Sequence, residues 1–310
     1  VPPPYGPKPQ RFLDLKNGHP LDDRIVFIGG AEGIDESGEE EISSGEKNEP
    51  HRYYFNGSCA NIMSCTTFLK AFFEPFDALT QSESTFRTKT FADCKHRPSY
   101  KYYGCKSPAD IRAVWKRNAR LGTLMHANLE AHFNGEPFTV LKENIPCFQQ
   151  FQALFNDTDW VQWEPFRTEW SVCDPETLIA GQIDLAGLVN RERGELVLID
   201  WKRAENISDC SFARFKGASQ NVGGCGGHGP CQVLEDCNFV LYSLQLGVYA
   251  YILHKYGFRT VKMFILQFHP KNNGGLAGVY QAPNLAHIVE EMFAARKIVL
   301  REHGIQTQPV

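Results

Sequence analysis

The stretch GQIDLAGLVNRERGELVLIDWK, residues 181–202, decides the fold of this chain. Two apolar runs flank a polar segment that ends in glycine, and this pattern predicts a β-hairpin, two strands joined by a short turn. Directly paired residues of a hairpin have position numbers with a constant sum, and a turn centred on Glu192 sets that sum at 384, which is 184 plus 200. The sequence therefore predicts that Asp184 and Asp200 lie opposite each other on one face of a sheet.

A cationic side chain follows on the same predicted strand. Lys202 joins the face of Asp200 through the two-residue period of a strand, whereas Trp201 points to the other face. A bulge at Gly194 would shift the register by one residue and separate the two aspartates.

Two carboxylates that face each other inside an apolar sheet repel and are poorly solvated, and a cation is the usual reason to keep such a pair. Oxygen ligands favour Mg²⁺ or Mn²⁺, and either ion both activates water and polarises a phosphoryl oxygen. Lys202 beside the pair offers a positive charge for an attacking hydroxide or for charge that develops on phosphorus. The alternative, two aspartates at strand ends exposed to water, is less favoured because the flanking residues are apolar.

Apolar periodicity predicts further helices and strands on both sides of the hairpin. One long helix begins at the serine cap Ser107, has Pro108 at its first position and ends at Gly135. The other predicted elements are a strand near 51–57, helices at 65–76, 148–155, 239–256 and 285–301, and strands at 167–173 and 261–268. Helices and strands in this order predict an α/β fold with a mixed central sheet flanked by helices.

Composition divides the chain into three parts. Residues 1–50 are rich in Pro, Gly and acids and predict a flexible arm. Residues 51–106 predict a helical, basic N-terminal subdomain. Residues 107–310 predict the α/β core, with a Cys- and Gly-rich loop at 208–238.

Charge is unevenly distributed along the chain. The formal net charge of −4 argues against attraction of the whole molecule to nucleic acid, yet the segment from Arg87 to Arg120 holds ten Lys and Arg against two acids. This segment predicts a phosphate-facing surface whose aromatic residues suit stacking on unpaired bases. The alternative is a solvated helix face with tyrosines packed in a core. The candidate DNA-binding residues are Lys95, Arg97, Tyr100, Lys101, Tyr102, Lys116, Arg117 and Arg120.

Ten cysteines in 310 residues do not require a disulfide scaffold. Most stand singly among apolar residues, as free buried thiols do, which favours a reducing intracellular compartment with nuclear, mitochondrial and viral settings all open. The first residues show no signal peptide, and the most apolar run, 239–253, contains too many polar residues to span a membrane.

One group of possible metal ligands lies in the Gly-rich loop. Cys225, His228, Cys231 and Cys237 have the number and type of ligands of a structural Zn²⁺ site, although their spacing is not that of a standard zinc finger. The alternative is a metal-free loop that contacts substrate.

Four motifs occur around the hairpin in a fixed order. They are GTLMHANLE at 122–130, GQID at 181–184, DWK at 200–202 and QLGVY at 245–249. With these motifs the chain resembles the PD-(D/E)XK nuclease superfamily, which has a restriction-endonuclease-like core. Within it the chain resembles the RecB-like branch that includes lambda-type exonucleases and the mitochondrial genome maintenance exonuclease. The proline that usually precedes the second motif is absent, and residues 51–76 resemble the leader of large-virus and protist members.

The resemblance implies a metal centre. It implies that His126, Asp184 and Asp200 bind the ion together with the main-chain carbonyl of Trp201, and that Glu130 is a candidate for a further ligand. An imidazole among oxygen ligands makes Mn²⁺ at least as suitable as Mg²⁺.

The resemblance also implies an activity. Gln245 and Tyr249, one helical turn apart, are expected to orient Lys202 or to hold a phosphate, and Glu169 is expected to supply an acid near the site. The activity so implied is hydrolysis of DNA, in exonuclease mode, on single strands or free ends. An endonuclease on the same scaffold and a non-catalytic nucleic-acid-binding module are the alternatives. The intact set of acids, Lys202 and Gln245 speaks against the binding module.

Overall fold

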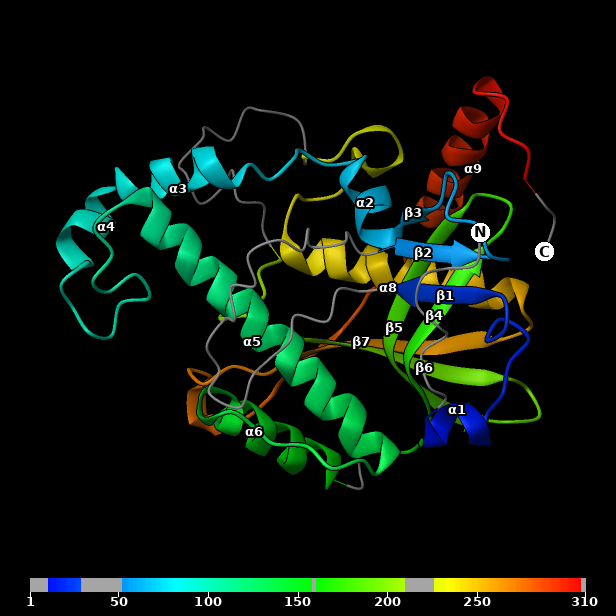
Figure 1. The fold of residues 1–310 in the computed structure, drawn as a ribbon, viewed down its shortest axis with the longest axis horizontal. Coiled ribbons are helices and arrows are strands. Elements are labelled where there is room, and N and C mark those ends of the chain that lie inside the picture. The colour runs from blue at the N-terminus through cyan, green and yellow to red at the C-terminus, as the bar shows by residue number, and fades with distance from the viewer. Residues whose placement is uncertain (1–10, 29–51, 158–159, 210–225, 308–310) are drawn as a thin grey trace.

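The computed structural model describes residues 11–28, 52–157, 160–209 and 226–307. At its centre is a six-stranded mixed sheet in the order β3-β5-β6-β7-β8, with β4 paired to β5 off this path (Figure 1). β5 runs parallel to β3 and antiparallel to β4 and β6, while β7 runs parallel to β6 and antiparallel to β8. The strands are β3 (Met63–Ser64), β4 (Glu164–Asp174), β5 (Ile179–Asn190), β6 (Glu195–Lys202), β7 (Arg259–Gln267) and β8 (Gly278–Gln281).

The hairpin of β5 and β6 has the predicted register. Leu185 pairs with Ile199 and Leu188 pairs with Leu196, and the position numbers of both pairs sum to 384. The register shifts beyond Leu188, next to the turn, so the irregularity does not reach the level of the aspartates. The predicted register is therefore confirmed for residues 185–188 of β5, while the strand pairing ends before it reaches Asp184 and Asp200.

One edge of β5 is shared by two strands. β4 pairs with β5 along nearly its whole length on one edge, so β3 and β6 must occupy the other edge, where they pair with residues 179–180 and 185–190. Within the described part of the chain, residues 181–184 have no strand partner on that second edge. Asp184 lies where β6 leaves β5, and its Oδ2 accepts a hydrogen bond from the main-chain nitrogen of Trp201 at 2.9 Å.

Helices cover both faces of the sheet, so the predicted α/β fold with a mixed central sheet flanked by helices is present. In the larger hydrophobic cluster, Leu244 of α8 and Phe293 of α9 pack with Leu198 of β6. In the second cluster, Leu129 of α5 packs with the next residue of β6, Ile199, because successive strand residues point to opposite faces. The helices of the body are α2 (Cys65–Lys70), α5 (Pro108–Asn134), α6 (Ile145–Phe155), α8 (Asn238–Lys255) and α9 (Ala286–Glu302).

Short 3₁₀ helices and free cysteines complete the described body. The 3₁₀ helices are η1 (Lys142–Asn144), η2 (Gly229–Cys231) and η3 (Asn273–Gly275). All eight cysteines in the described residues are free. Among the described helices, none combines the length and the apolar character that crossing a membrane requires.

Part of the predicted flexible N-terminal arm packs against the body instead. Residues 11–28 form α1 (Phe12–Lys16) and β1 (Ile25–Ile28), and β1 pairs antiparallel with β2 (Arg52–Phe55). The prediction of flexibility is wrong for residues 11–28, while residues 29–50 lie outside the described part of the chain.

The reason is a buried charge that this segment neutralises. The Arg167 side chain of β4 is only 5 % exposed, and its guanidinium lies 2.9 Å from a carboxylate oxygen of Asp14 and 2.7 Å from one of Asp22. Leu13 and Leu21 are buried beside them. Asp14 and Asp22, which belong to the acid-rich segment, therefore pair with a buried arginine. Burying that guanidinium without partners would be costly.

A helical extension lies at the N-terminal end of α5, away from the sheet (Figure 1). It contains α3 (Ala78–Phe86) and α4 (Lys89–Cys94), and we call residues 76–120 the extension. Its own small core includes Phe91, Tyr102 and Ile111. The start of α5 is as predicted, since the hydroxyl of Ser107 accepts a hydrogen bond from the main-chain nitrogen of Asp110.

Candidate metal centre

Three side chains from three elements meet beside the irregular edge of β5. Thr168 pairs with Leu185 and Trp170 pairs with Ile183, so the two intervening residues, one on β4 and one on β5, lie across from each other. These residues are Glu169 and Asp184.

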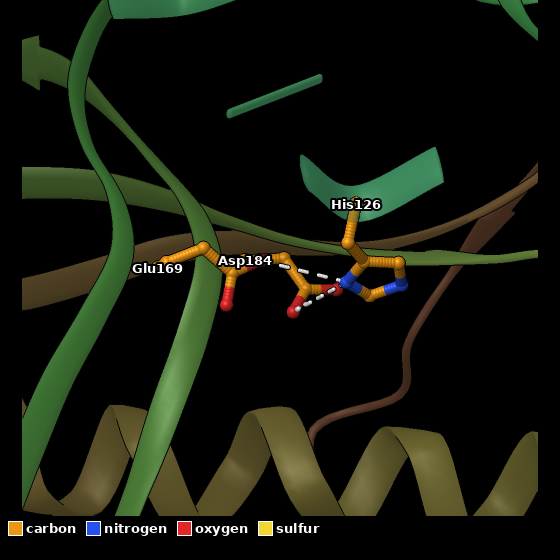
Figure 2. A group of neighbouring side chains, drawn as sticks. All are labelled: His126, Glu169 and Asp184. Atoms are coloured by element: carbon orange, nitrogen blue, oxygen red, sulfur yellow. Dashed lines mark ion pairs between the residues drawn. The ribbon is translucent and has the colours of Figure 1, made fainter. Parts of the chain in front are cut away.

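The third side chain, that of His126, reaches them from α5 (Figure 2). His126 Nδ1 lies 3.5 Å from Glu169 Oε1 and 3.6 Å from Asp184 Oδ1. The three ligand atoms lie within 4.8 Å of one another, so one ion placed between them could contact all three. We call His126, Glu169 and Asp184 the metal cluster.

Glu169 has a strained backbone. Its φ of 43° lies in the left-handed region, which costs a residue other than glycine about 1–2 kcal/mol. Strain of this kind persists where the surrounding structure enforces it, and it is most frequent at functional sites. Here the strand pairs on either side of Glu169 enforce it.

Two carboxylate oxygens at the site are buried without a hydrogen-bond partner among the described residues. They are Oε1 of Glu169 and Oδ2 of Asp200. Neither oxygen atom is accessible to solvent, so water does not compensate for the missing partners. Buried oxygens of this kind are costly unless a cation satisfies them, and a hard divalent cation prefers such oxygens as ligands. The residues present therefore fit a divalent metal ion.

The electrostatics of the cluster lead to the same conclusion. Burial alone would lower the pKa of His126, but the negative charges of Asp184 and Glu169 outweigh it and raise that pKa to about 9. Burial raises the pKa of Asp184. A protonated imidazole thus supplies positive charge between the two carboxylates, in the place that a metal ion would take.

Asp200 and Lys202 form a second pair on β6. Lys202 Nζ lies 2.7 Å from Asp200 Oδ1. Burial raises the pKa of Asp200 to about 6, although the ammonium group acts in the opposite direction. Burial would also lower the pKa of Lys202, yet the charges of Asp200 and Asp184 outweigh it and raise that pKa. Of the three side chains that the resemblance implies as ligands, the cluster thus contains His126 and Asp184, together with Glu169 in place of Asp200.

Gln245 and Tyr249 contact each other on α8. Gln245 Nε2 donates a hydrogen bond to Tyr249 Oη at 3.1 Å. The buried Tyr249 ring packs onto Gly181, where a Cβ atom would lie only 2.5 Å from the ring. Close approach of the ring therefore requires glycine at this position of the second motif. The ring that lies over Lys202 belongs to another residue of α8, Tyr242, at 4.7 Å from the ammonium nitrogen to the ring centroid.

Sequence reasoning missed two tyrosines at the site. Tyr242 precedes Gln245 by three residues and Tyr249 by seven, so helical spacing was a signal that could have found it. Tyr53 of β2 is the other. Burial raises the pKa of Tyr53, and the nearby charges of Glu169 and Asp184 contribute to the shift. No motif marks Tyr53, because only the tertiary fold brings β2 to the site.

Glu130 lies one turn beyond His126 on α5 but outside the metal cluster. Its carboxylate pairs with the guanidinium of Arg11 at 3.0 Å, so it helps to hold the N-terminal segment. His126 and Glu130 share one helix face, yet the partner of Glu130 comes from a part of the chain that was expected to be flexible.

The predicted zinc ligands do not converge in the described residues. Cys225 lies outside them. His228 Nε2 lies 3.1 Å from Glu74 Oε1, Cys231 is buried with its sulfur 3.6 Å from that of Met292, and Cys237 is buried directly before α8. Among the described residues, the grouping of possible metal ligands is the one formed by His126, Glu169 and Asp184.

The candidate DNA-binding residues divide into a core part and a surface part. Tyr102 is buried, and its hydroxyl accepts a hydrogen bond from the indole nitrogen of Trp115 at 2.9 Å. Tyr100 is half-buried and packs edge-to-face against Tyr102. These two tyrosines follow the alternative interpretation of residues packed in a core. The half-buried or exposed cationic residues are Lys95, Arg97, Lys101, Lys116, Arg117 and Arg120, of which Arg117 pairs with Glu143.

Comparison with known proteins gives a limited result. No model of a known protein family matches the chain, and no curated protein matches it. A solved structure from Eubacterium rectale, described as a "putative exonuclease", is similar at 13% identity over 78% of this chain and 79% of that chain, with a TM-score of 0.40. A second, described as SSO0001, is similar at 13% identity over 81% of this chain and 79% of that chain, with a TM-score of 0.31. At these identities and TM-scores, neither structure identifies the function of this chain.

Proposed function

We propose that this chain is a divalent-metal-dependent nuclease that hydrolyses phosphodiester bonds of DNA. The observation that carries the proposal is the convergence of His126, Glu169 and Asp184, with Asp200 and Lys202 on the adjoining strand. Buried carboxylates and an imidazole beside a buried ammonium group suit phosphoryl chemistry, where a metal and a cation share the charge of the transition state. The motifs that resemble the PD-(D/E)XK nucleases support the same assignment.

We assign roles to the side chains as follows. His126, Glu169 and Asp184 would hold the ion, and the unpartnered Oδ2 of Asp200 offers a fourth ligand atom on the next strand. An ion held there would supply a Lewis acid that activates water and polarises a phosphoryl oxygen. Lys202 is kept charged by Asp200 and is backed by the Tyr242 ring, so its ammonium group can stabilise negative charge on the reacting phosphate.

DNA with a single-stranded or free end is the proposed substrate, and exonuclease mode is the proposed mode. The support is the resemblance of the motifs and the basic character of the extension, whose exposed Lys95, Arg97, Lys101 and Lys116 suit contacts to phosphates. Mn²⁺ and Mg²⁺ are the proposed ions, because the cluster combines oxygen ligands with one imidazole.

The test is a cleavage time course on end-labelled linear, single-stranded and circular DNA with Mg²⁺ or Mn²⁺. We expect loss of linear substrate, an intact circle, and no cleavage in EDTA. Asp184→Asn and Lys202→Ala should lower the rate by at least about a hundredfold while leaving the circular dichroism spectrum unchanged. Full activity in EDTA or in either variant would refute the metal-dependent mechanism. Cleavage of the circle would assign an endonuclease, and binding without cleavage would assign a non-catalytic module.

A further inference from the structure

An exposed aromatic side chain lies at the start of the extension, directly before α3. Phe76 is 68 % exposed, and its ring centroid lies 5.8 Å from that of Trp115. Trp115 is half-buried and is fixed in place by the hydrogen bond from its indole nitrogen to Tyr102. A phenyl ring this exposed does not gain the free energy of burial. Together with the fixed indole beside it, the ring forms an apolar surface that no described residue covers.

The segment that carries Trp115 is rich in positive charge. The segment from Arg87 to Arg120 holds ten Lys and Arg against Asp93 and Asp110. Asp110 accepts hydrogen bonds from the main-chain nitrogens that precede α5, so the positive end of the helix dipole partly offsets its charge. Lys116, next to Trp115 in the chain, is exposed.

The two acids that flank Phe76 are also engaged within the protein. Asp77 accepts hydrogen bonds from the main-chain nitrogens of Leu79 and Thr80, and Glu74 pairs with His228. Aromatic rings among cations form the chemistry that binds unpaired nucleobases, because the ring stacks on the base while the cations hold the phosphates.

α5 connects this surface to the metal cluster. Trp115 and His126 are eleven residues apart, 126 minus 115, which is close to three full turns, so both side chains lie on nearly the same side of the helix. At 1.5 Å per residue the separation along the axis is about 16 Å, the length of about five stacked nucleotides. Between them on that side stand the small residues Ala119 and Gly122. A DNA single strand lying along α5 could therefore reach both the aromatic surface and the metal cluster.

We infer that Phe76 and Trp115 form a stacking platform for unpaired bases of a DNA single strand whose phosphodiester lies at the metal cluster. The inference rests on the proposed function for its substrate. Phe76 and Trp115 thus take the place of Tyr100 and Tyr102 as the proposed base-contacting residues, because those two tyrosine rings pack in the core of the extension. It also sets a shortest single strand, of about five nucleotides, that can use both the platform and the cluster.

The test measures binding without cleavage, by fluorescence anisotropy of labelled oligothymidylate of about twelve nucleotides in EDTA. Phe76→Ala should weaken binding about tenfold, and Phe76→Tyr should restore it, since one stacked base contributes an effect of this size. Leu79→Ala is the matched control. Leu79 is a neighbouring side chain of the extension that is 60 % exposed and has no ring, and its loss should leave the affinity unchanged.

Two further ligands separate stacking from charge. An abasic strand of the same length keeps its phosphates, so it should bind more weakly than oligothymidylate and equally well to the unchanged protein and to Phe76→Ala. A strand of about three nucleotides is too short to span the distance and should also not distinguish the two proteins. Equal affinity of both proteins for the long oligothymidylate would overturn the platform.

The nuclease proposal is tested separately by the cleavage assay on the unchanged protein. An active enzyme with equal affinities would lose only the platform. An inactive protein that still shows the tenfold effect would lose only the nuclease. A protein that binds none of these strands would overturn the platform as well.

Discussion

At the scale of single residues, Glu169 has two energetically unfavourable features that a bound metal ion would explain. Its backbone is in the left-handed region at φ 43°, and its buried Oε1 has no hydrogen-bond partner among the described residues. A divalent ion between Glu169, His126 and Asp184 would satisfy that oxygen and neutralise the paired carboxylates. The proposal that Glu169 is a metal ligand therefore rests on its structure and not on the sequence motifs.

Replacing this side chain tests its role as a ligand. Glu169→Gln should lower the affinity for Mn²⁺ by about tenfold or more, because a neutral amide oxygen replaces a charged one. Isothermal titration calorimetry measures the effect. Glu143→Gln is the control, since the Glu143 side chain is 43% exposed on η1 and pairs with Arg117 away from the cluster. Unchanged affinity in Glu169→Gln would remove this residue from the ligand set.

His126 makes metal binding dependent on pH. Its pKa is raised to about 9 from an ordinary 6.5, so the protonated ring adds stability to the metal-free fold that is fully present below pH 6.5 and is lost as the pH rises through 9. A metal ion requires the neutral ring, so binding of Mg²⁺ at about pH 7 should release close to one proton. Calorimetry in buffers of different ionisation enthalpy counts that proton. The release should fall to about half a proton near pH 9 and toward zero at higher pH, and no release at neutral pH would contradict this ligand role.

At the scale of elements, the sequence predicted those features that neighbouring residues determine. The hairpin register follows from alternation and turn length, and the start of α5 follows from the Ser107 cap, so both agree with the structure. The short strands β3 and β8 were not predicted, because a strand of two to four residues carries too little pattern of its own and is held by its neighbours. α1 and β1 were missed for a related reason, since distant partners hold this segment: Asp22, between the two elements, pairs with Arg167 145 residues away, and β1 pairs with β2.

The site could be predicted to a similar extent. Asp184, Asp200 and Lys202 belong to the two strands of one hairpin, so the hairpin alone brings them near each other. Tyr53 and the pairing of Glu130 with Arg11 depend on contacts between distant segments, which no spacing along the chain reveals.

The contact between β5 and α8 gives a prediction at this scale. Gly181→Ala should destabilise the protein by about 2 kcal/mol, because its Cβ would lie 2.5 Å from the Tyr249 ring inside a packed core. Thermal unfolding measures the loss. Gly18→Ala is the matched control, since a Cβ there meets no atom within 4 Å, and it should change the melting temperature little. Equal effects of the two substitutions would show that the ring does not pack as described.

At the scale of the whole molecule, the metal cluster depends on segments that are distant in the chain. α5 supplies His126, β4 supplies Glu169 and β5 supplies Asp184, while β6 adds Asp200 and Lys202 beside the cluster. Figure 1 shows how these elements are arranged. α8 contributes Tyr242, which lies against Lys202, and Tyr249, which packs onto Gly181, while the N-terminal segment anchors α5 through Glu130. The extension carries the basic surface at the other end of α5. One helix therefore links the region proposed to receive DNA to the region proposed to cut it.

The most direct test of this account is anomalous X-ray scattering from crystals of the protein soaked in Mn²⁺. We predict one strong anomalous peak between Glu169 Oε1, Asp184 Oδ1 and His126 Nδ1, at about 2.1 Å from each after the side chains close around the ion. The peak should be absent in Asp184→Asn. A manganese ion bound elsewhere, with the three side chains left as they are, would contradict the assignment of the metal centre.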